Sequence, residues 1–216
     1  MWLKIDCSCL DLGAGDSGTT TVAPDATTMT TSSATTTMTS APATTDVLDD
    51  CWDVVKGKVV QEIQNWGKLY MVQFEITVSN SGEGWINVFH FTADSNKAKY
   101  GDRIPVLFIK KNTDNEAGYF YIGSDISGLC SVAKYYDYEL EKKYQITIKQ
   151  SKDSGNKYWY EIIINAQSIF MIENTAPVSF PNVKLYGSDP WYNSFSSDHG
   201  SVCNFTIGKI FDIIKY

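Results

Sequence analysis

The chain has 216 residues, of which 43% are hydrophobic and 13% aromatic, and 25 acidic against 18 basic residues give it a net charge of −7. This composition is typical of a soluble globular protein and excludes a wholly disordered chain. A net negative charge with a single arginine argues against binding to nucleic acid phosphates. No stretch approaches the roughly 20 uncharged apolar residues that a membrane-spanning helix needs, so no transmembrane segment is predicted.

The N-terminal quarter differs from the rest in composition. Residues 1–16 carry charges at Lys4, Asp6 and Asp11. These charges interrupt the apolar run of a secretion signal, so we expect a start further upstream or a fragment of a longer extracellular chain. Residues 17–46 contain 13 Thr and 4 Ser, which predicts a disordered, mucin-like, O-glycosylated stalk or an unmodified disordered linker.

Residues 47–216 hold 28 of the 29 aromatic residues and are predicted to form the folded domain. Three of the five cysteines lie there, Cys51, Cys130 and Cys203, and allow three pairings. We favour Cys51 with Cys203, because that bridge would join the first and last strands. Cys7 and Cys9 have no nearby partner for a metal site. An intermolecular disulfide from that pair stays open.

Alternating apolar residues predict that this domain is built of strands. The clearest candidates are 70–78, 144–148 and 158–164, and weaker ones are 54–60, 85–92, 104–109, 119–122, 168–172, 183–186 and 202–214. No window has a convincing helical period. The expected fold class is therefore all-β, a two-sheet antiparallel β-sandwich of the jelly-roll type behind a disordered N-terminal tract.

The order of several segments resembles the concanavalin-like sandwiches, which include galectins and laminin G-like modules. The segments that carry this resemblance are 85–92, 100–105, 158–165 and 182–191. His90 and Phe91 match the first two residues of the galectin strand His-Phe-Asn-Pro-Arg, whereas Thr92 and Asp94 replace its asparagine and arginine. The resemblance implies a sugar-binding sandwich, but the lost guanidinium means that galactoside specificity does not carry over.

A glycosidase on such a fold would need paired carboxylates on one strand. Asp137, Glu139 and Glu141 have the alternating spacing, but Lys142 and Lys143 follow at once. A solvated loop or edge strand is the better interpretation. We therefore predict no catalytic residues and no enzyme.

Arg103, the only arginine, could bind ligand hydroxyls or carboxylates, or fix a turn. His90 lies on the same predicted face as Ile86 and Val88, and is either a core histidine or a ligand contact. The segment 188–195 contains Trp191 and Tyr192 among polar turn residues. Their rings could stack on a sugar, anchor a protein partner or cover one end of the sandwich.

The predicted ligand-binding set consists of His90, Arg103, Asp189, Trp191, Tyr192 and Asn193. Asp189, Asn193 and Asp198 are oxygen ligands of the kind calcium prefers, and a second such loop surrounds Asp153. Neither spacing matches a calcium loop, so no cofactor or metal is assigned, and calcium is kept as a lesser alternative. Asn204 begins the sequon Asn-Phe-Thr and is a predicted N-glycosylation site if the chain is secreted.

These features together predict a secreted or cell-surface recognition and adhesion module that binds glycans, with no catalysis. The alternative is a structural or matrix module that binds extracellular proteins, with self-association an added option. The two interpretations differ in whether the predicted ligand-binding residues converge on one face.

Overall fold

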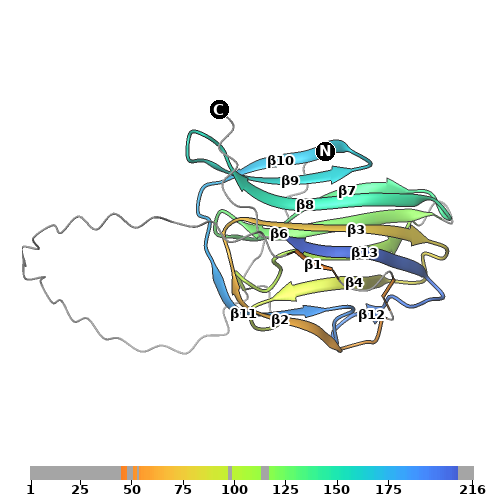
Figure 1. The fold of residues 1–216 in the computed structure, drawn as a ribbon. Coiled ribbons are helices and arrows are strands. Elements are labelled where there is room, and N and C mark those ends of the chain that lie inside the picture. Colours follow the sequence, from red (N-terminus) through yellow and green to blue (C-terminus); the bar gives the residue numbers. More distant parts are fainter. Residues whose placement is uncertain (1–44, 48–50, 53, 97–98, 113–116, 209–216) are drawn as a thin grey trace, which may run out of the picture. The chain divides into compact units, whose positions relative to one another are not determined.

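The computed structural model describes residues 45–47, 51–52, 54–96, 99–112 and 117–208. These residues form thirteen strands and no helix (Figure 1). Most of the predicted tracts 1–16 and 17–46 therefore lie outside the description. Within it, no helix is long and apolar enough to span a membrane.

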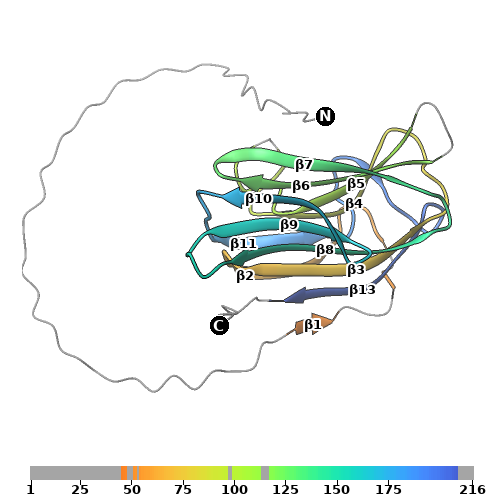
Figure 2. The ribbon, with the colours of Figure 1, turned by 90° about the horizontal axis from the view of Figure 1, so that it is seen from above.

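The strands form two sheets, which lie as two layers in the views of Figures 1 and 2. The six-stranded sheet has the order β1 (Thr45–Val47), β13 (Gly200–Gly208), β3 (Tyr70–Val78), β8 (Lys143–Lys152), β9 (Tyr158–Ile164) and β10 (Gln167–Asn174). The seven-stranded sheet has the order β2 (Val59–Trp66), β11 (Phe180–Tyr186), β4 (Trp85–Thr92), β5 (Val106–Lys111), β6 (Gly118–Ile126) and β7 (Leu129–Tyr138), with β12 (Asn193–Ser194) beside β4. All pairings are antiparallel except that of β12 with β4. The predicted two-sheet antiparallel sandwich is confirmed.

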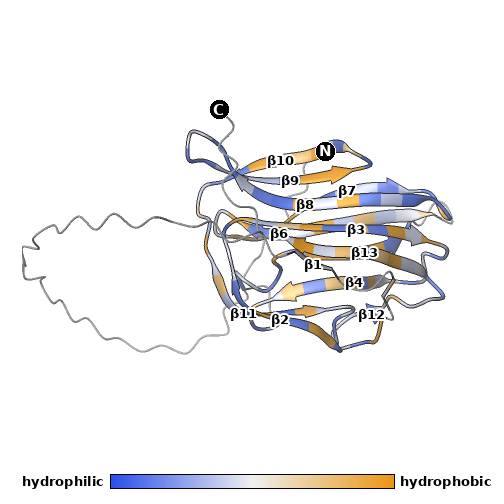
Figure 3. Cartoon of the chain, viewed as in Figure 1, coloured by the Kyte–Doolittle hydropathy of each residue, from blue (hydrophilic) through white to orange (hydrophobic). Residues whose placement is uncertain are grey.

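The core lies between the sheets and follows from the two-residue alternation of the strands. In β3 every second residue from Tyr70 to Val78 is buried, and the intervening side chains are half-buried. The same pattern continues in β8 and β9, which are its neighbours along the sheet. Figure 3 shows hydrophobic and hydrophilic residues mixed along the strands. Burying such a face is the main stabilising term of a sandwich.

Several strands differ from their predicted bounds. The strand predicted over 54–60 is β2, Val59–Trp66, and the structure adds β1, β7 and β12. β2 and β7 are the edges of the seven-stranded sheet. Edge strands bury less of each face, so their sequences show weaker apolar alternation. β1 contains Thr45 and Asp46, which the sequence assigned to the linker. The predicted strand over 202–214 is described as far as Gly208.

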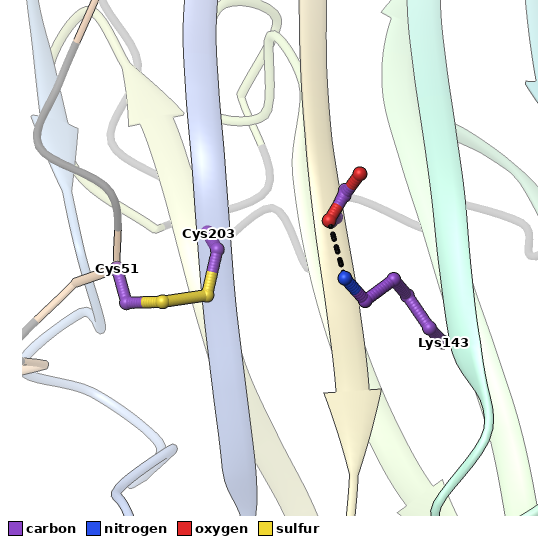
Figure 4. The surroundings of a disulfide bond; sticks show 4 residues. Cys51, Lys143 and Cys203 are labelled. Atoms are coloured by element: carbon purple, nitrogen blue, oxygen red, sulfur yellow. Dashed lines mark hydrogen bonds and ion pairs between the residues drawn. A yellow bond between two sulfur atoms is a disulfide. The ribbon is translucent and has the colours of Figure 1, made fainter.

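Residue 51 is joined to β13 by a disulfide. Cys51 bonds Cys203, as the sequence favoured, and the two residues also form a β-bridge (Figure 4). Nearby, Lys143 donates to Glu75 of β3 at 2.9 Å. The disulfide closes a separation of 152 residues, so it constrains nearly the whole domain in the unfolded state.

Candidate functional site

A loop crosses the outer face of β4. β11 pairs with the second half of β4, and β12 pairs with its first half. The chain between them, residues 187–192, leaves the sheet and runs over the outer side chains of β4. As a result β4 is buried on both faces, with only Trp85 half-buried.

A β-bulge decides which side chains of β4 lie under this loop. The register shifts between Asn87, which is opposite Phe108, and Phe89, which is opposite Leu107. His90 is therefore opposite Val106 and shares the outer face with Asn87. The prediction that His90 shares the face of Ile86 and Val88 is wrong, because the bulge inserts one extra residue.

His90 and Asp189 form a buried pair beneath the loop. Both are 0% exposed, and His90 Nδ1 lies 2.8 Å from Asp189 Oδ2. His90 Nε2 faces the carbonyl oxygen of Asp102. A carbonyl only accepts hydrogen bonds, so we infer that Nε2 carries a hydrogen and that a further proton lies between Nδ1 and the carboxylate. His90 is thus a satisfied buried residue with no surface open to a ligand.

Asp189 also fixes the backbone of the loop. Its Oδ1 accepts the N–H groups of Trp191 at 3.0 Å and Tyr192 at 2.9 Å. Its own N–H donates to Asn87 Oδ1 at 2.8 Å. The sequence placed Asp189 among the ligand contacts, but in the structure it is fully buried and positions the two rings that follow it.

Those two rings lie on the outer surface of the seven-stranded sheet. Trp191 is 42% exposed, and its centroid lies 5.6 Å from that of His90 and 5.7 Å from that of Tyr186. Tyr192 is half-buried, and its centroid lies 4.8 Å from that of Phe108. The predicted alternative, in which Trp191 turns inward to cover one end of the sandwich, is not what the structure shows.

Arg103 ties the loop to two other segments. Its Nη2 donates to the Tyr192 hydroxyl at 3.2 Å and its Nη1 donates to Ser131 Oγ at 3.0 Å. Nε and Nη2 both donate to Asn96 Oδ1, at 3.2 and 3.1 Å. The Arg103 guanidinium therefore donates four hydrogen bonds to other groups of the protein. Arg103 therefore holds Tyr192 in place, a structural role that differs from the expected one of fixing the turn before the next strand.

More aromatic rings continue from Tyr192 across the sheet. Trp85 lies 6.1 Å from Tyr119, and Tyr119 lies 5.2 Å from Tyr135, between ring centroids. All three are half-buried, and Trp85 and Tyr135 contact the buried rings of Phe108 and Tyr121. We call Trp85, Tyr119, Tyr135, Trp191 and Tyr192 the aromatic face. Its β4, β6 and β7 members were missed as site residues, because only the strand order brings them together.

The aromatic face carries few charges. Lys110 lies between Trp85 and Tyr119 in the strand register, and its Nζ is 4.7 Å from the Trp85 ring centroid. Asp137 is opposite Tyr119 on β7 and is exposed. Burial raises the pKa of Tyr135, and the neighbouring tyrosines Tyr121 and Tyr119 add to that effect. The Tyr135 hydroxyl therefore stays neutral and can both donate and accept at physiological pH.

Three of the six predicted residues, Arg103, Trp191 and Tyr192, converge on this surface, with His90 and Asp189 beneath them. Asn193 lies at its rim, where it is exposed and donates from Nδ2 to the Glu83 carbonyl at 3.1 Å. The predicted glycosylation site Asn204 is also exposed, but it belongs to β13 of the other sheet. Glycosylation there stays a prediction.

The remaining sequence candidates lie elsewhere. Glu139 is exposed and forms an ion pair with Lys142 at 2.7 Å in the turn after β7. Asp137 and Glu141 are also exposed, as expected for the solvated segment that the sequence favoured. Cys130 lies in β7, outside the disulfide.

In each of the two loops considered for calcium, one carboxylate already accepts N–H groups. Asp153 accepts from Gly155, Lys157 and the Trp159 indole, and Asp189 accepts as described above. These bonds lower the pKa of Asp153, the Trp159 indole having the largest effect. Among the residues described, no group of three or more His, Cys, Asp or Glu has metal-site geometry.

Comparison of the sequence with protein-family models finds no match, and comparison with curated proteins finds none. Partial matches occur among solved structures. A heptameric SAP-like pentraxin from Limulus polyphemus is 14% identical with a TM-score of 0.45, over 69% of this chain and 67% of that chain. An endo-β-1,4-glucuronan lyase from the fungus Trichoderma reesei is 13% identical with a TM-score of 0.44, over 78% and 88%. The receptor binding domain of botulinum neurotoxin D is 13% identical with a TM-score of 0.45, over 77% and 44%.

Proposed function

We propose that this protein is an extracellular recognition module whose aromatic face binds glycans without catalysis. The observation that carries the proposal is the convergence of Trp191, Tyr192 and Arg103 with Trp85 and Tyr119 on one outer sheet surface. Partly exposed rings beside hydroxyl and amide groups supply the two kinds of contact that a sugar needs, apolar stacking and hydrogen bonding.

The way the loop is held supports this proposal. Asp189 fixes the backbone at Trp191 and Tyr192, and Arg103 fixes the Tyr192 hydroxyl. A binding surface whose side chains are already ordered loses less conformational entropy when a ligand binds. Trp191 is 42% exposed although its loop is held by buried groups. Such an exposed, immobilised ring suits recognition better than core packing.

The proposed location is secreted or cell-surface. The Cys51–Cys203 disulfide supports it, because such bonds persist mainly in oxidising compartments. The exposed side chain of Asn204 is accessible for glycosylation there.

A second candidate is protein adhesion, including self-association. Within the described residues, β10 is an edge strand of the six-stranded sheet, and its residue Met171 is 58% exposed. An edge strand with an exposed apolar side chain can pair with a strand of another chain. This alternative uses a different sheet from the aromatic face. A substitution on the aromatic face, such as Trp191→Ala, should therefore leave adhesion through β10 unchanged.

The test is a glycan array probed with the full chain, made through a secretory route, with and without calcium. Trp191→Ala should weaken any binding about 30-fold, which corresponds to a hot-spot loss of about 2 kcal/mol. Trp159→Ala is the matched control, because Trp159 is a half-buried tryptophan on the outer face of the six-stranded sheet. Absence of binding by the folded wild type, or equal loss in both variants, would contradict the proposal.

A further inference from the structure

The outer side of β10 is an open edge of the six-stranded sheet. β10 pairs with β9 on one side, and within the described residues no strand pairs with its other side (Figure 1). Backbone N–H and C=O groups on such an edge are a template for pairing with another chain, unless the sequence protects them with charges, prolines or a short strand.

The other edge strands have protection that β10 lacks. On β7, Lys134 is opposite the fully buried Ile122, so an edge strand there carries a charge on its core-side face. β2 carries the exposed Glu62, and β1 is only three residues long. β10 contains no proline and one charged residue, Glu173, whose charge is already paired with Lys157 at 3.1 Å.

The regular part of this edge is centred on Met171. A bulge between Ser168 and Phe170 breaks the register before it. The carbonyl oxygen of Glu173 accepts from Ser127 Oγ at 3.3 Å, so this carbonyl points away from β9. Peptide groups alternate in direction along an antiparallel pair, so the N–H and C=O of Met171, two residues earlier, also point outward.

The side chains of this edge are complementary to those of a second copy. In an antiparallel pairing centred on Met171, each Met171 faces the other, and the two exchange a pair of backbone hydrogen bonds. Phe170 is then opposite Ile172 of the second copy, and Glu173 is opposite Ile169. Met171 is 58% exposed, and Phe170, Ile169 and Ile172 are half-buried. Apolar side chains therefore meet, and no two like charges face each other.

We propose that two copies of this chain pair through β10 about a two-fold axis at Met171, which joins their six-stranded sheets into one. This pairing gives the adhesion candidate a defined partner, and it does not rest on glycan binding. The aromatic face belongs to the other sheet, so a dimer carries two such faces and can bind a multivalent glycan with avidity. The pairing is short, so its interface belongs to the weak class that buries less than about 1,200 Å².

The test is sedimentation velocity of the full chain from about 5 to 500 µM, with Cys7→Ser and Cys9→Ser in every sample so that intermolecular disulfides from that pair cannot contribute. The mean mass of the parent chain should rise with concentration towards twice that of the monomer. Met171→Lys and Met171→Glu should each weaken dimerisation at least about tenfold, because two like charges would then face each other. An equal mixture of these two variants should dimerise again, because opposite charges then face each other.

Leu129→Lys is the matched control. Leu129 is 50% exposed on the edge strand β7, so it places the same charge on the other sheet and should leave dimerisation unchanged. A parent chain that stays monomeric, an equal loss in Leu129→Lys, or a mixture of the Met171 variants that stays monomeric would overturn the proposal. A monomer that binds glycans would leave the aromatic face standing, and a dimer that binds none would overturn only the glycan proposal.

Discussion

We predict that the buried pair of His90 and Asp189 contributes strongly to the free energy of unfolding. Asp189→Ala removes the acceptor for His90 Nδ1 at 2.8 Å, Trp191 N–H at 3.0 Å and Tyr192 N–H at 2.9 Å. Each buried group left without a partner costs about 1–3 kcal/mol. The two backbone N–H groups lie at partly exposed residues and can regain water. Removing one partner of a buried pair typically costs about 3–5 kcal/mol, which is our expected loss in free energy of unfolding.

Asp189→Asn should lower the free energy of unfolding by only about 1–2 kcal/mol. Its carbonyl oxygen still accepts the two backbone N–H groups, and its NH₂ can donate to a neutral His90. Urea unfolding of the full chain, followed by tryptophan fluorescence, measures both variants. Asp198→Ala is the control, because Asp198 is exposed in the following loop and should change stability by less than about 0.5 kcal/mol. If Asp189→Ala matched that control, the pair would not hold the loop.

Three further variants test other parts of the fold. Replacing Cys51 and Cys203 by serine should lower the free energy of unfolding by about 3–5 kcal/mol, because the disulfide spans 152 residues. Titration of thiols before and after reduction verifies the bond, and equal numbers of thiols in the two samples would contradict it. Tyr160→Phe should stabilise the protein by up to about 1 kcal/mol, because the fully buried hydroxyl has no partner among the described residues; a loss above that amount in thermal unfolding would refute this. Asp125 has its pKa raised from 3.8 to about 6 by burial. The folded state therefore binds its proton more tightly, and the free energy of unfolding should rise as the pH falls from 6 to 4, by up to about 3 kcal/mol. Asp125→Asn should lack this rise. If the free energy of unfolding changed with pH in the same way in the wild type and in Asp125→Asn, the raised pKa of Asp125 would be refuted.

Two strands have the bounds that the sequence predicted. They are β3, Tyr70–Val78, in which every second residue is buried, and β4, Trp85–Thr92, which is buried on both faces. β7, Leu129–Tyr138, was not predicted as a strand, because its outer residues are mostly half-buried and its sequence mixes tyrosine with charge. A half-buried edge strand needs no strict alternation, so its sequence carries little signal.

The site was predictable only in its local part. Trp191 and Tyr192 are adjacent aromatic residues in a turn, and the sequence alone singled them out. Trp85, Tyr119 and Tyr135 come together because β4, β5, β6 and β7 lie side by side, which no local pattern specifies. The burial of His90 on the outer face depends on a bulge and on a loop from about 100 residues later in the chain.

One hydrogen-bonded chain links the buried Asp125 to the aromatic face. Ser131 donates its N–H to Asp125, and its hydroxyl meets both the Tyr121 hydroxyl at 2.5 Å and Arg103 Nη1 at 3.0 Å. Arg103 in turn holds Tyr192 on the aromatic face. A change at Asp125 can therefore reach the aromatic face through two side chains. Asp125→Asn alone cannot assign a lost binding activity to that face, whereas Trp191→Ala can, because it leaves the shared serine in place.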